Sequence, residues 1–228
     1  MSLRIAAPTQ SFLAGQFVRL QMTLDGNEVV RTYSLVNSPD NPVTEILFNT
    51  VPNGAFSNAL AKLVPGDPIG VSQPASGFFT LNEVPGCDTL WLFATGTGTG
   101  PFLSMLQTDE PWNRFAQTVL VQSVPRVEDL AYANIFRDIA NRRGGQFRYL
   151  PCVTQASFEE GINQRFTTAL SSGLLESVAG QSITAKDSHV MLCGNHRMLD
   201  DMKSLLGERG LHKHLRHKPG HITTEQYF

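Results

Sequence analysis

The chain has 228 residues and a mass of 25.1 kDa, and its 41% of hydrophobic residues support a packed core and exclude wholesale disorder. With 18 Lys and Arg against 20 Asp and Glu the net charge is −2, which argues against a basic nucleic-acid binder. No apolar run approaches the ~20 residues of a membrane span, and we expect no signal peptide.

The cysteines indicate the cellular setting. Three of them, Cys87, Cys152 and Cys193, lie far apart in the chain. An odd and scattered set argues against a disulfide framework and for a reducing cytoplasm. It also leaves no ligand set for an iron–sulfur cluster. We therefore expect a cytoplasmic globular protein, with a monomer as the default.

Short apolar or alternating runs, separated by strong turn sequences, fill the first 85 residues or so. The turn sequences include Asp25-Gly26, Pro52-Asn53-Gly54 and Pro65-Gly66-Asp67. Between them we predict strands over residues 3–6, 16–24, 29–36, 44–51 and 68–72. One stretch, residues 55–63, has apolar residues at helical spacing and predicts a short helix. This pattern indicates a small antiparallel β-barrel or sandwich.

From about residue 87 strands and helices alternate. We predict strands over residues 89–94, 118–123, 146–153 and 189–193, and helices over 101–107, 130–142, 165–171 and 197–209. Such alternation indicates an α/β domain with a parallel sheet and right-handed crossovers. We place the boundary at residues 84–88, which gives domains of 1–86 and 87–228.

The glycine-rich run Ala94-Thr95-Gly96-Thr97-Gly98-Thr99-Gly100-Pro101 stands between a predicted strand and a predicted helix. Glycines let backbone N–H groups approach a pyrophosphate, and the helix N-terminus favours its negative charge. The spacing is not the full dinucleotide fingerprint, and no Gly-Lys-Ser/Thr follows, which disfavours a nucleoside-triphosphate loop. An ordinary tight turn is the alternative.

Two motifs in the N-terminal part have the chemistry of a nucleotide site. Arg31-Thr32-Tyr33-Ser34 combines a phosphate-binding fork, a flat aromatic face and a short hydroxyl. By itself an ordinary half-exposed strand explains it better. Gly54-Ala55-Phe56-Ser57 begins the predicted short helix, where a phosphate can bind, although a plain helix cap explains it equally well.

Two features lie near the C-terminus. Cys193-Gly194-Asn195 ends a predicted strand, at the sheet edge where ligands bind, although most free cysteines are small buried hydrophobes. The tail that begins at Lys213 is rich in histidine, but no Asp, Glu or Cys interleaves the histidines up to His221. We therefore expect a solvated basic surface rather than a metal site.

Taken together and in this order, these motifs resemble the ferredoxin–NADP reductase family, above all its bacterial ferredoxin/flavodoxin–NADP reductases. The resemblance runs from Leu13-Ala14-Gly15-Gln16-Phe17 nearly to the last residue. It implies an FAD-binding antiparallel β-barrel, an NADP-binding α/β domain, and a nicotinamide that meets the flavin between them. The implied activity is hydride transfer between NADPH and FAD, with single electrons passing to a ferredoxin or flavodoxin.

The resemblance also implies roles for single residues. Arg31 binds the pyrophosphate, Tyr33 lies against the isoalloxazine and Ser34 lies near its reactive nitrogen. The implied FAD contacts are Arg31, Thr32, Tyr33, Ser34, Gly54, Ala55, Phe56, Ser57, Thr97, Tyr227 and Phe228. The implied NADP contacts are Gly96, Gly98, Val124, Arg126, Thr154, Gln155, Arg165, Cys193, Gly194 and Asn195. The implied catalytic set is Ser34, Cys193 in the nicotinamide pocket and Phe228 over the flavin, with no metal.

The sequence departs from the family pattern at its N-terminus and at two residues near its C-terminus, and each departure leads to an expectation. Relatives have about one further strand before Met1, so we expect a shortened chain or a misplaced start; an unpaired barrel edge that weakens flavin retention is the alternative. His196 stands in place of a proline, and Phe228 in place of a bulkier tryptophan, which eases nicotinamide access.

The 2′-phosphate site departs from the pattern as well. Pro125 takes the place of one arginine, with Arg126 next to it, and Gln155 takes the place of another, while Arg165 is kept. An acidic residue for the ribose of NADH is absent from residues 123–127, the segment just after the strand, although Glu128 and Asp129 follow closely. We expect a preference for NADPH over NADH with reduced discrimination.

The basic residues Lys213, Arg216 and Lys218 are candidates to steer an acidic carrier, with a solvated face as the alternative. Other functions remain open. One is an NAD(P)H reductase for free flavin or for an oxygenase, and another is a shortened flavin-binding protein without turnover.

Overall fold

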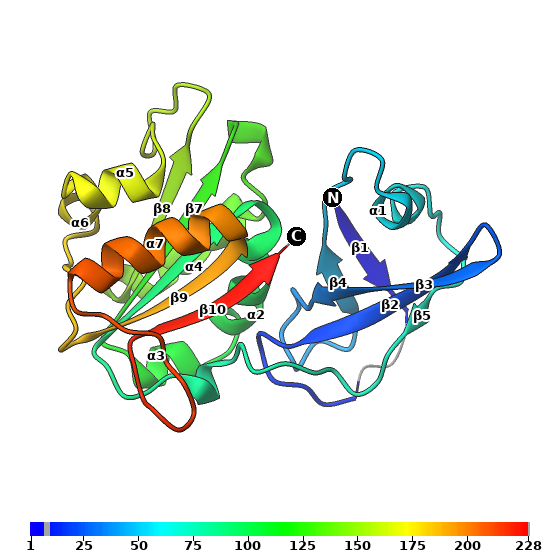
Figure 1. The fold of residues 1–228 in the computed structure, drawn as a ribbon, viewed down its shortest axis with the longest axis horizontal. Helices are drawn as coiled ribbons and strands as arrows, with labels where there is room; N and C mark the ends of the chain where they lie inside the picture. The colour runs from blue at the N-terminus through cyan, green and yellow to red at the C-terminus, as the bar shows by residue number, and fades with distance from the viewer. Residues whose placement is uncertain (7–9, 228) are drawn as a thin grey trace. The chain divides into compact units, whose positions relative to one another are not determined.

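The structure is a computed structural model that describes residues 1–6 and 10–227. The chain divides into two compact units (Figure 1). Unit 1 comprises Met1–Leu81 and Gly100–Thr108, and unit 2 comprises Asn82–Thr99 together with the described chain from Asp109 onward. Within the described residues, no helix is long and apolar enough to cross a membrane.

Unit 1 is built on antiparallel strands. One sheet has the order β3-β2-β5 and another pairs β1 with β4. A bridge between Leu35 and Ile46 continues the pairing from the end of β3 towards β4. The strands are β1 (Ser2–Ile5), β2 (Phe17–Leu24), β3 (Asn27–Ser34), β4 (Thr44–Leu47) and β5 (Gly70–Val71). They surround a core that includes Val18, Leu20 and Phe56.

The β2–β3 hairpin confirms the predicted Asp25-Gly26 turn. Leu24 pairs with Asn27, so the loop has two residues, and both have positive φ, 49° at Asp25 and 77° at Gly26. Such a turn matches the right-handed twist of the flanking strands. It extends β3 back to Asn27, two residues before the predicted start.

Two helices belong to unit 1. Helix α1 (Ala55–Leu60) is shorter than the predicted 55–63, and it buries Phe56 and Leu60. Helix α2 (Gly100–Leu106) packs in the same unit, where Ser104 Oγ donates to the carbonyl oxygen of Asn37 at 2.7 Å.

Unit 2 contains a parallel sheet with the strand order β10-β9-β6-β7-β8. The strands are β6 (Thr89–Thr95), β7 (Gln117–Val124), β8 (Phe147–Val153), β9 (Ser188–Asn195) and β10 (Ile222–Tyr227). The helices are α3 (Glu110–Arg114), α4 (Ala133–Arg143), α5 (Phe166–Ser171), α6 (Leu174–Ala179) and α7 (His196–Glu208). Short 3₁₀ turns are η1 (Leu81–Glu83), η2 (Gly96–Thr99), η3 (Val127–Asp129) and η4 (Gly144–Gln146).

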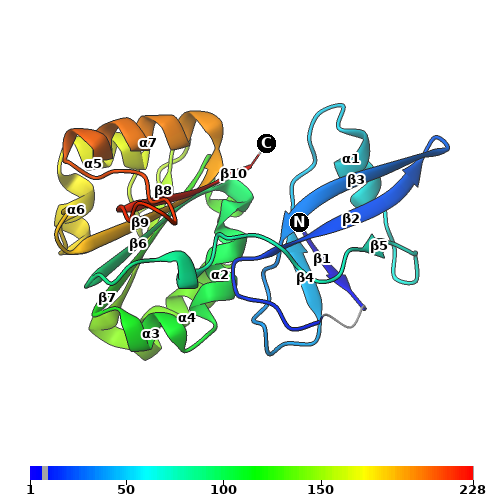
Figure 2. The same cartoon turned by 60° about the horizontal axis from the view of Figure 1, so that its bottom comes forward.

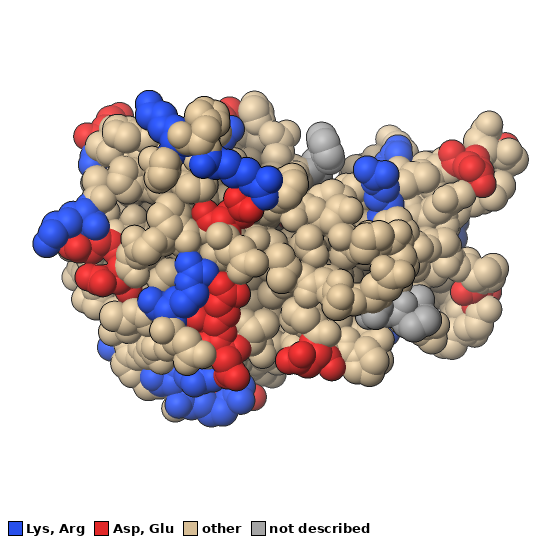
Figure 3. Space-filling view, turned by 90° about the horizontal axis from the view of Figure 1, so that it is seen from below, with Lys and Arg blue, Asp and Glu red and all other residues tan. Residues whose placement is uncertain are grey.

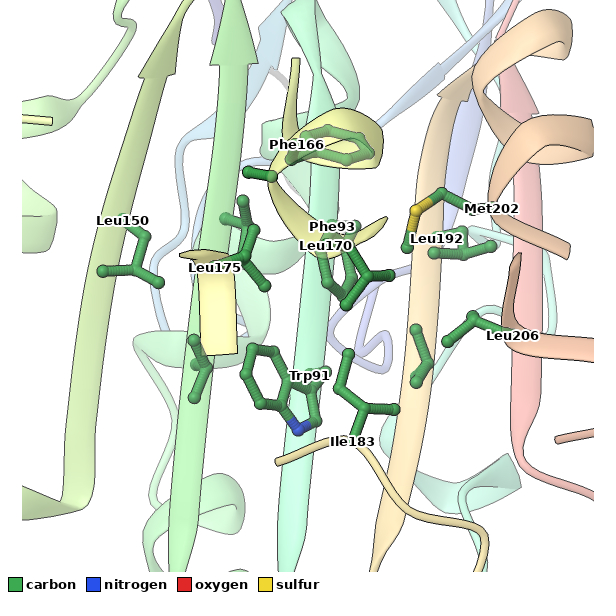
Figure 4. Packing of buried hydrophobic residues seen from close by; sticks show 14 of the residues in the cluster. Trp91, Phe93, Leu150, Phe166, Leu170, Leu175, Ile183, Leu192, Met202 and Leu206 are labelled. Atoms are coloured by element: carbon green, nitrogen blue, oxygen red, sulfur yellow. The ribbon is translucent and has the colours of Figure 1, made fainter. Parts of the chain in front are cut away.

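Helices cover both faces of this sheet, with α5, α6 and α7 on one face and α3 and α4 on the other (Figure 2). Six of the seven residues of β6 are buried, as expected of a strand covered on both faces. On the face of α5 to α7, Trp91 and Phe93 pack against Phe166, Leu170 and Met202 (Figure 4).

Three elements of unit 2 were not predicted. Helices α3 and α6 have five and six residues, too short for a periodic pattern to stand out. Strand β10 is polar over Thr223–Gln226, which made it indistinguishable from a solvated tail. The expectation of a solvated surface is therefore wrong for Ile222–Tyr227, which pairs in parallel with β9 because the sheet supplies its backbone partners.

Candidate functional site

Strand β3 carries the first predicted motif of unit 1. Alternation along the strand puts Arg31 and Tyr33 on one face and Thr32 and Ser34 on the other. Arg31 and Thr32 are exposed, Tyr33 is half-buried and Ser34 is buried. Arg31 Nη1 donates to the carbonyl oxygen of Val30 at 2.8 Å. A guanidinium has five N–H donors, so this contact leaves capacity to bind an anion.

Tyr33 connects this strand to helix α1. Its ring stacks on Phe56 with centroids 6.1 Å apart and meets Phe48 edge-on at 6.5 Å. Burial raises the pKa of the Tyr33 phenol, and the charge of Arg31 partly offsets this. The phenol therefore stays protonated near neutral pH and offers a flat surface for an aromatic ligand. Because Phe56 belongs to the second predicted motif, the two motifs of unit 1 lie together.

The N-terminus of α1 has backbone groups that are suited to bind an anion. Gly54 occupies the N-cap position, and no side chain caps the helix there. Ser57 Oγ instead accepts a hydrogen bond from the Val51 N–H at 3.0 Å, and Asn58 Nδ2 donates to the Gly54 carbonyl oxygen at 2.8 Å. The first backbone N–H groups of a helix have no partner within it, so this uncapped end suits a phosphate.

The carboxyl edge of the sheet gathers the predicted residues of unit 2. β7 and β8 lie on one side of β6, while β9 and β10 lie on the other. The winding therefore reverses between β6 and β9, at the kind of switch point where open α/β sheets bind ligands. Gly96, Thr97 and Gly98 follow β6 in η2, and Gly194 and Asn195 end β9.

Gly98 lies directly against the end of β9. A Cβ at this position would lie 2.8 Å from the carbonyl carbon of Cys193 and 3.2 Å from its Sγ, so only glycine fits without a shift of the backbone. Thr99 follows in the same turn, and its buried Oγ1 has no hydrogen-bond partner within the described part of the chain. The close approach fixes the turn against the end of β9, and the unpaired Thr99 hydroxyl leaves one polar group of the turn without a partner in the described chain.

Thr95, which belongs to the glycine-rich motif but was given no role in the sequence analysis, connects two strand ends. Its Oγ1 accepts hydrogen bonds from the Asn195 backbone N–H at 3.2 Å and from Asn195 Nδ2 at 3.3 Å. Asn195 Oδ1 in turn accepts from the Met198 N–H at 2.9 Å and caps α7. A Cβ at Gly194 would collide with Thr95 Oγ1. The available signal was the place of Thr95 at the end of a buried strand, directly before Gly96.

Cys193 is wholly buried at this edge. Burial raises the pKa of its thiol well above the usual range, the Glu225 carboxylate raises it further, and a hydrogen bond with Tyr227 lowers it in part. The thiol is therefore neutral and unsuited to act as a nucleophile. Strand register pairs Glu225 with Cys193, a neighbour missed because β10 was not predicted. Phe228 lies outside the described residues.

The ends of β7 and β8 hold the remaining predicted residues. The Thr154 N–H donates to the Val124 carbonyl oxygen at 3.0 Å, and the Gln155 N–H donates to that of Pro125 at 2.8 Å. These bonds fasten the turn after β7 to the turn after β8. The exposed side chains of this group are those of Arg126, Gln155 and Arg165.

The histidine-rich segment 211–221 is a loop held by backbone contacts. His221 Nδ1 accepts from the His212 N–H at 3.1 Å, and His214 Nδ1 accepts from the Gly220 N–H at 3.2 Å. Burial, aided by His214 and His221, lowers the pKa of His189 to about 3, so that ring stays neutral. Among the described residues, no group of three or more His, Cys, Asp or Glu is placed to hold a metal.

Comparison with known proteins assigns both parts of the chain. Residues 1–79 match the oxidoreductase FAD-binding domain, and residues 92–204 match the oxidoreductase NAD-binding domain. Over 228 residues the chain is 44% identical to the flavodoxin/ferredoxin–NADP reductases of Shigella flexneri and Escherichia coli, covering 100% of this chain and 92% of each relative. The chain belongs to the flavodoxin/ferredoxin–NADP reductase family. The resemblance stated from the sequence is thereby confirmed.

A solved member of this reductase family has the same fold. It is a ferredoxin NADP⁺ reductase from Neisseria gonorrhoeae with bound FAD and NADP, and it matches with a TM-score of 0.94 at 29% identity. The match covers 100% of this chain and 92% of that chain. The predicted fold class, an antiparallel β-barrel domain followed by an α/β parallel-sheet domain, is confirmed.

Proposed function

We propose that this chain is an FAD-dependent ferredoxin/flavodoxin–NADP reductase that transfers electrons between NADPH and a small carrier. The observation that supports the proposal is that each unit has a segment with the chemistry to bind a nucleotide. In unit 1 this is the uncapped start of α1 beside Tyr33, and in unit 2 it is the glycine turn against Cys193. FAD, when bound, exchanges a hydride with nicotinamide and single electrons with a carrier. The protein then has to hold and orient both groups, which needs no general base.

We assign FAD to residues 1–86. Arg31 binds the pyrophosphate as a cationic fork, together with backbone N–H groups of 54–57. The half-buried Tyr33 ring stacks on the isoalloxazine, and Ser34 supplies a hydroxyl near its reactive nitrogen. The exposed guanidinium, the Tyr33–Phe56 stack and the uncapped α1 support these roles.

We assign NADP(H) to residues 87–228. The turn Gly96–Thr99 receives the pyrophosphate, and Arg126 and Arg165 receive the 2′-phosphate, which favours NADPH over NADH. Cys193 is assigned to the nicotinamide pocket by the resemblance. Its complete burial and raised pKa support a neutral thiol beneath the turn rather than a reacting group. The roles of Thr97, Tyr227 and Phe228 stay predictions from the resemblance.

We assign carrier steering to Lys213 and Lys218, both exposed on the loop 211–221. Arg216, the third candidate, already donates to the Glu83 carboxylate, with Nε 2.9 Å from Oε2, and this bond lowers the pKa of Glu83. On the face of unit 2 shown in Figure 3, basic and acidic side chains are interspersed. A steering field therefore rests on Lys213 and Lys218, neither of which forms a salt bridge with another of the described residues. We further propose a monomer working in the cytoplasm, where the three free cysteines stay reduced.

Anaerobic titration of the FAD-loaded protein with NADPH, and in parallel with NADH, tests the proposal. We expect the visible flavin band to bleach at near-stoichiometric NADPH and to recover when oxidised ferredoxin or flavodoxin is added. Reoxidation by free flavin but by neither carrier would favour a flavin reductase. A protein that binds FAD without being reduced, or binds none, would contradict the assignment.

A further inference from the structure

In the turn after β7, two carboxylates lie close to the one arginine. Arg126 Nη1 lies 3.8 Å from Glu128 Oε1, and Asp129 Oδ2 accepts a hydrogen bond from the Arg126 N–H at 3.2 Å. The Arg126 and Glu128 side chains are 65% and 69% exposed, so a ligand can reach both. One guanidinium and two carboxylates leave this turn with a net charge of −1.

The turn lies at the position where dinucleotide-binding sheets contact the 2′ position of the ribose. It follows a central parallel strand at the carboxyl edge, and the bond from the Gln155 N–H to the Pro125 carbonyl oxygen fastens it to the turn after β8. At this position a carboxylate suits the free 2′-hydroxyl of NADH, whereas a cation suits the 2′-phosphate of NADPH. Here both charges are present within three residues.

We propose that Glu128 is the residue that limits the preference of this chain for NADPH. It holds Arg126 in an internal ion pair, so that a 2′-phosphate has to displace a carboxylate and then bind beside it. The proposal rests on the proposed NADP(H) site at this edge. Glu128 acts in two ways, by pairing with the Arg126 guanidinium and by repelling the 2′-phosphate directly, while Asp129 holds the backbone of the turn.

The expected size follows from screened electrostatics. A carboxylate that lies within a Debye length (~8 Å) of a phosphate dianion in a water-exposed site weakens binding by about 3- to 10-fold once salt screening is included. A ligand without the 2′-phosphate does not feel this repulsion. The same estimate predicts that the effect shrinks at high ionic strength.

Calorimetric titration of the FAD-loaded protein with 2′,5′-ADP and with 5′-AMP tests this directly, without turnover. We expect Glu128→Gln to tighten 2′,5′-ADP by about 3- to 10-fold and to change 5′-AMP by less than about twofold. The gain should fall at high salt, and it should shrink when Arg126→Gln is added. The matched control is Glu208→Gln, which removes the same charge about 18 Å along α7 from the carboxyl edge.

The outcomes separate the two proposals. Binding of both nucleotides with no tightening of 2′,5′-ADP in Glu128→Gln overturns the role of Glu128 and leaves the nucleotide site standing. Equal tightening of 5′-AMP, or an equal effect of Glu208→Gln, also overturns it. Failure of the parent chain to bind either nucleotide overturns the proposed site and the role of Glu128 together.

Discussion

The pyrophosphate sites that we assign to the two units differ in what builds them. In unit 1 the assigned strand motif consists of side chains, with Arg31 exposed and Tyr33 half-buried. In unit 2 the assigned turn is backbone packed against a strand end, with Gly98 and Cys193 both buried. The first arrangement separates binding from stability, because a side chain can be removed without disturbing the core. The second couples them, because the groups that shape the site also hold the strand ends.

The sharpest test of this contrast is Gly98→Ala. The added Cβ meets the backbone of Cys193, which cannot retreat from a central strand, so we expect a loss of about 1–3 kcal/mol in unfolding free energy. Affinity for 2′,5′-ADP should fall by at least about tenfold, or ~1.4 kcal/mol. Chemical unfolding and calorimetry measure the two effects.

Gly207→Ala is the control for that substitution. A Cβ at Gly207 in α7 meets nothing within 4 Å, so we expect a gain of about 0.5–1 kcal/mol in stability and unchanged binding. If Gly98→Ala behaved like Gly207→Ala, the turn would not be packed as described.

For unit 1 the corresponding change is Arg31→Ala. Loss of charge-assisted hydrogen bonds to a phosphate costs about 1.5–3 kcal/mol, so FAD should bind about 10- to 100-fold more weakly at unchanged stability of the protein without FAD. Recovery of free-flavin fluorescence on dilution measures this. Arg19, an exposed arginine on the neighbouring strand paired with Thr32, is the control, and Arg19→Ala should shift FAD binding by less than about twofold. An equal loss of FAD affinity in the two variants would mean that the overall positive charge of the strands, and not a specific contact of Arg31, binds the cofactor.

The pH dependence of stability should originate in unit 2. His189 has a pKa of about 3 in the folded chain, against an ordinary value of 6.5, because burial disfavours its charged form. The unfolded chain therefore binds the extra proton first as pH falls below 6.5, and folding stability drops between about pH 6.5 and pH 3. This group contributes at most about 1.4 kcal/mol per pH unit.

His189→Gln tests that expectation. His189 Nε2 lies 2.9 Å from Thr223 Oγ1, and a glutamine amide can keep this hydrogen bond without titrating. Urea unfolding measured at several pH values from 7 to 4 gives the free energy of unfolding at each pH. In His189→Gln this free energy should fall less steeply with decreasing pH than in the parent chain. An unchanged slope would assign the acid sensitivity to other groups.

The smallest expected effect concerns carrier steering. Lys213→Ala with Lys218→Ala should slow carrier reduction a few-fold at low ionic strength and weaken its salt dependence, because surface cations act mainly on association. Arg216→Ala should add little, since the Glu83 carboxylate already pairs with that charge, and exposed ion pairs of this kind contribute little to stability. Stopped-flow mixing at several salt concentrations compares the variants, and an unchanged rate for the double variant would rule out steering by these lysines.

Turn conformations could be predicted from the sequence wherever residues adjacent in the chain determine them. The Asp25-Gly26 hairpin and the glycine turn after β6 were predicted because each depends on a few adjacent residues. Strand β10 was missed because its polar side chains carry no core pattern. The roles of Glu225 and Thr95 were not predicted, because each depends on a contact with a residue of the neighbouring strand β9.

The order of a β domain followed by an α/β domain could be predicted from the amino-acid sequence, and the resemblance to the reductase family supplied the roles proposed for the motifs. Turn residues and periodicity are local properties, so they can be recognised without a structure. The position of β6 beside β9 became known only from the folded chain. That pairing puts Gly98 against Cys193 and joins Thr95 to Asn195 across 100 residues of chain. The physical reason is that strand order depends on which buried faces pack together, and periodicity describes a strand without naming its neighbour.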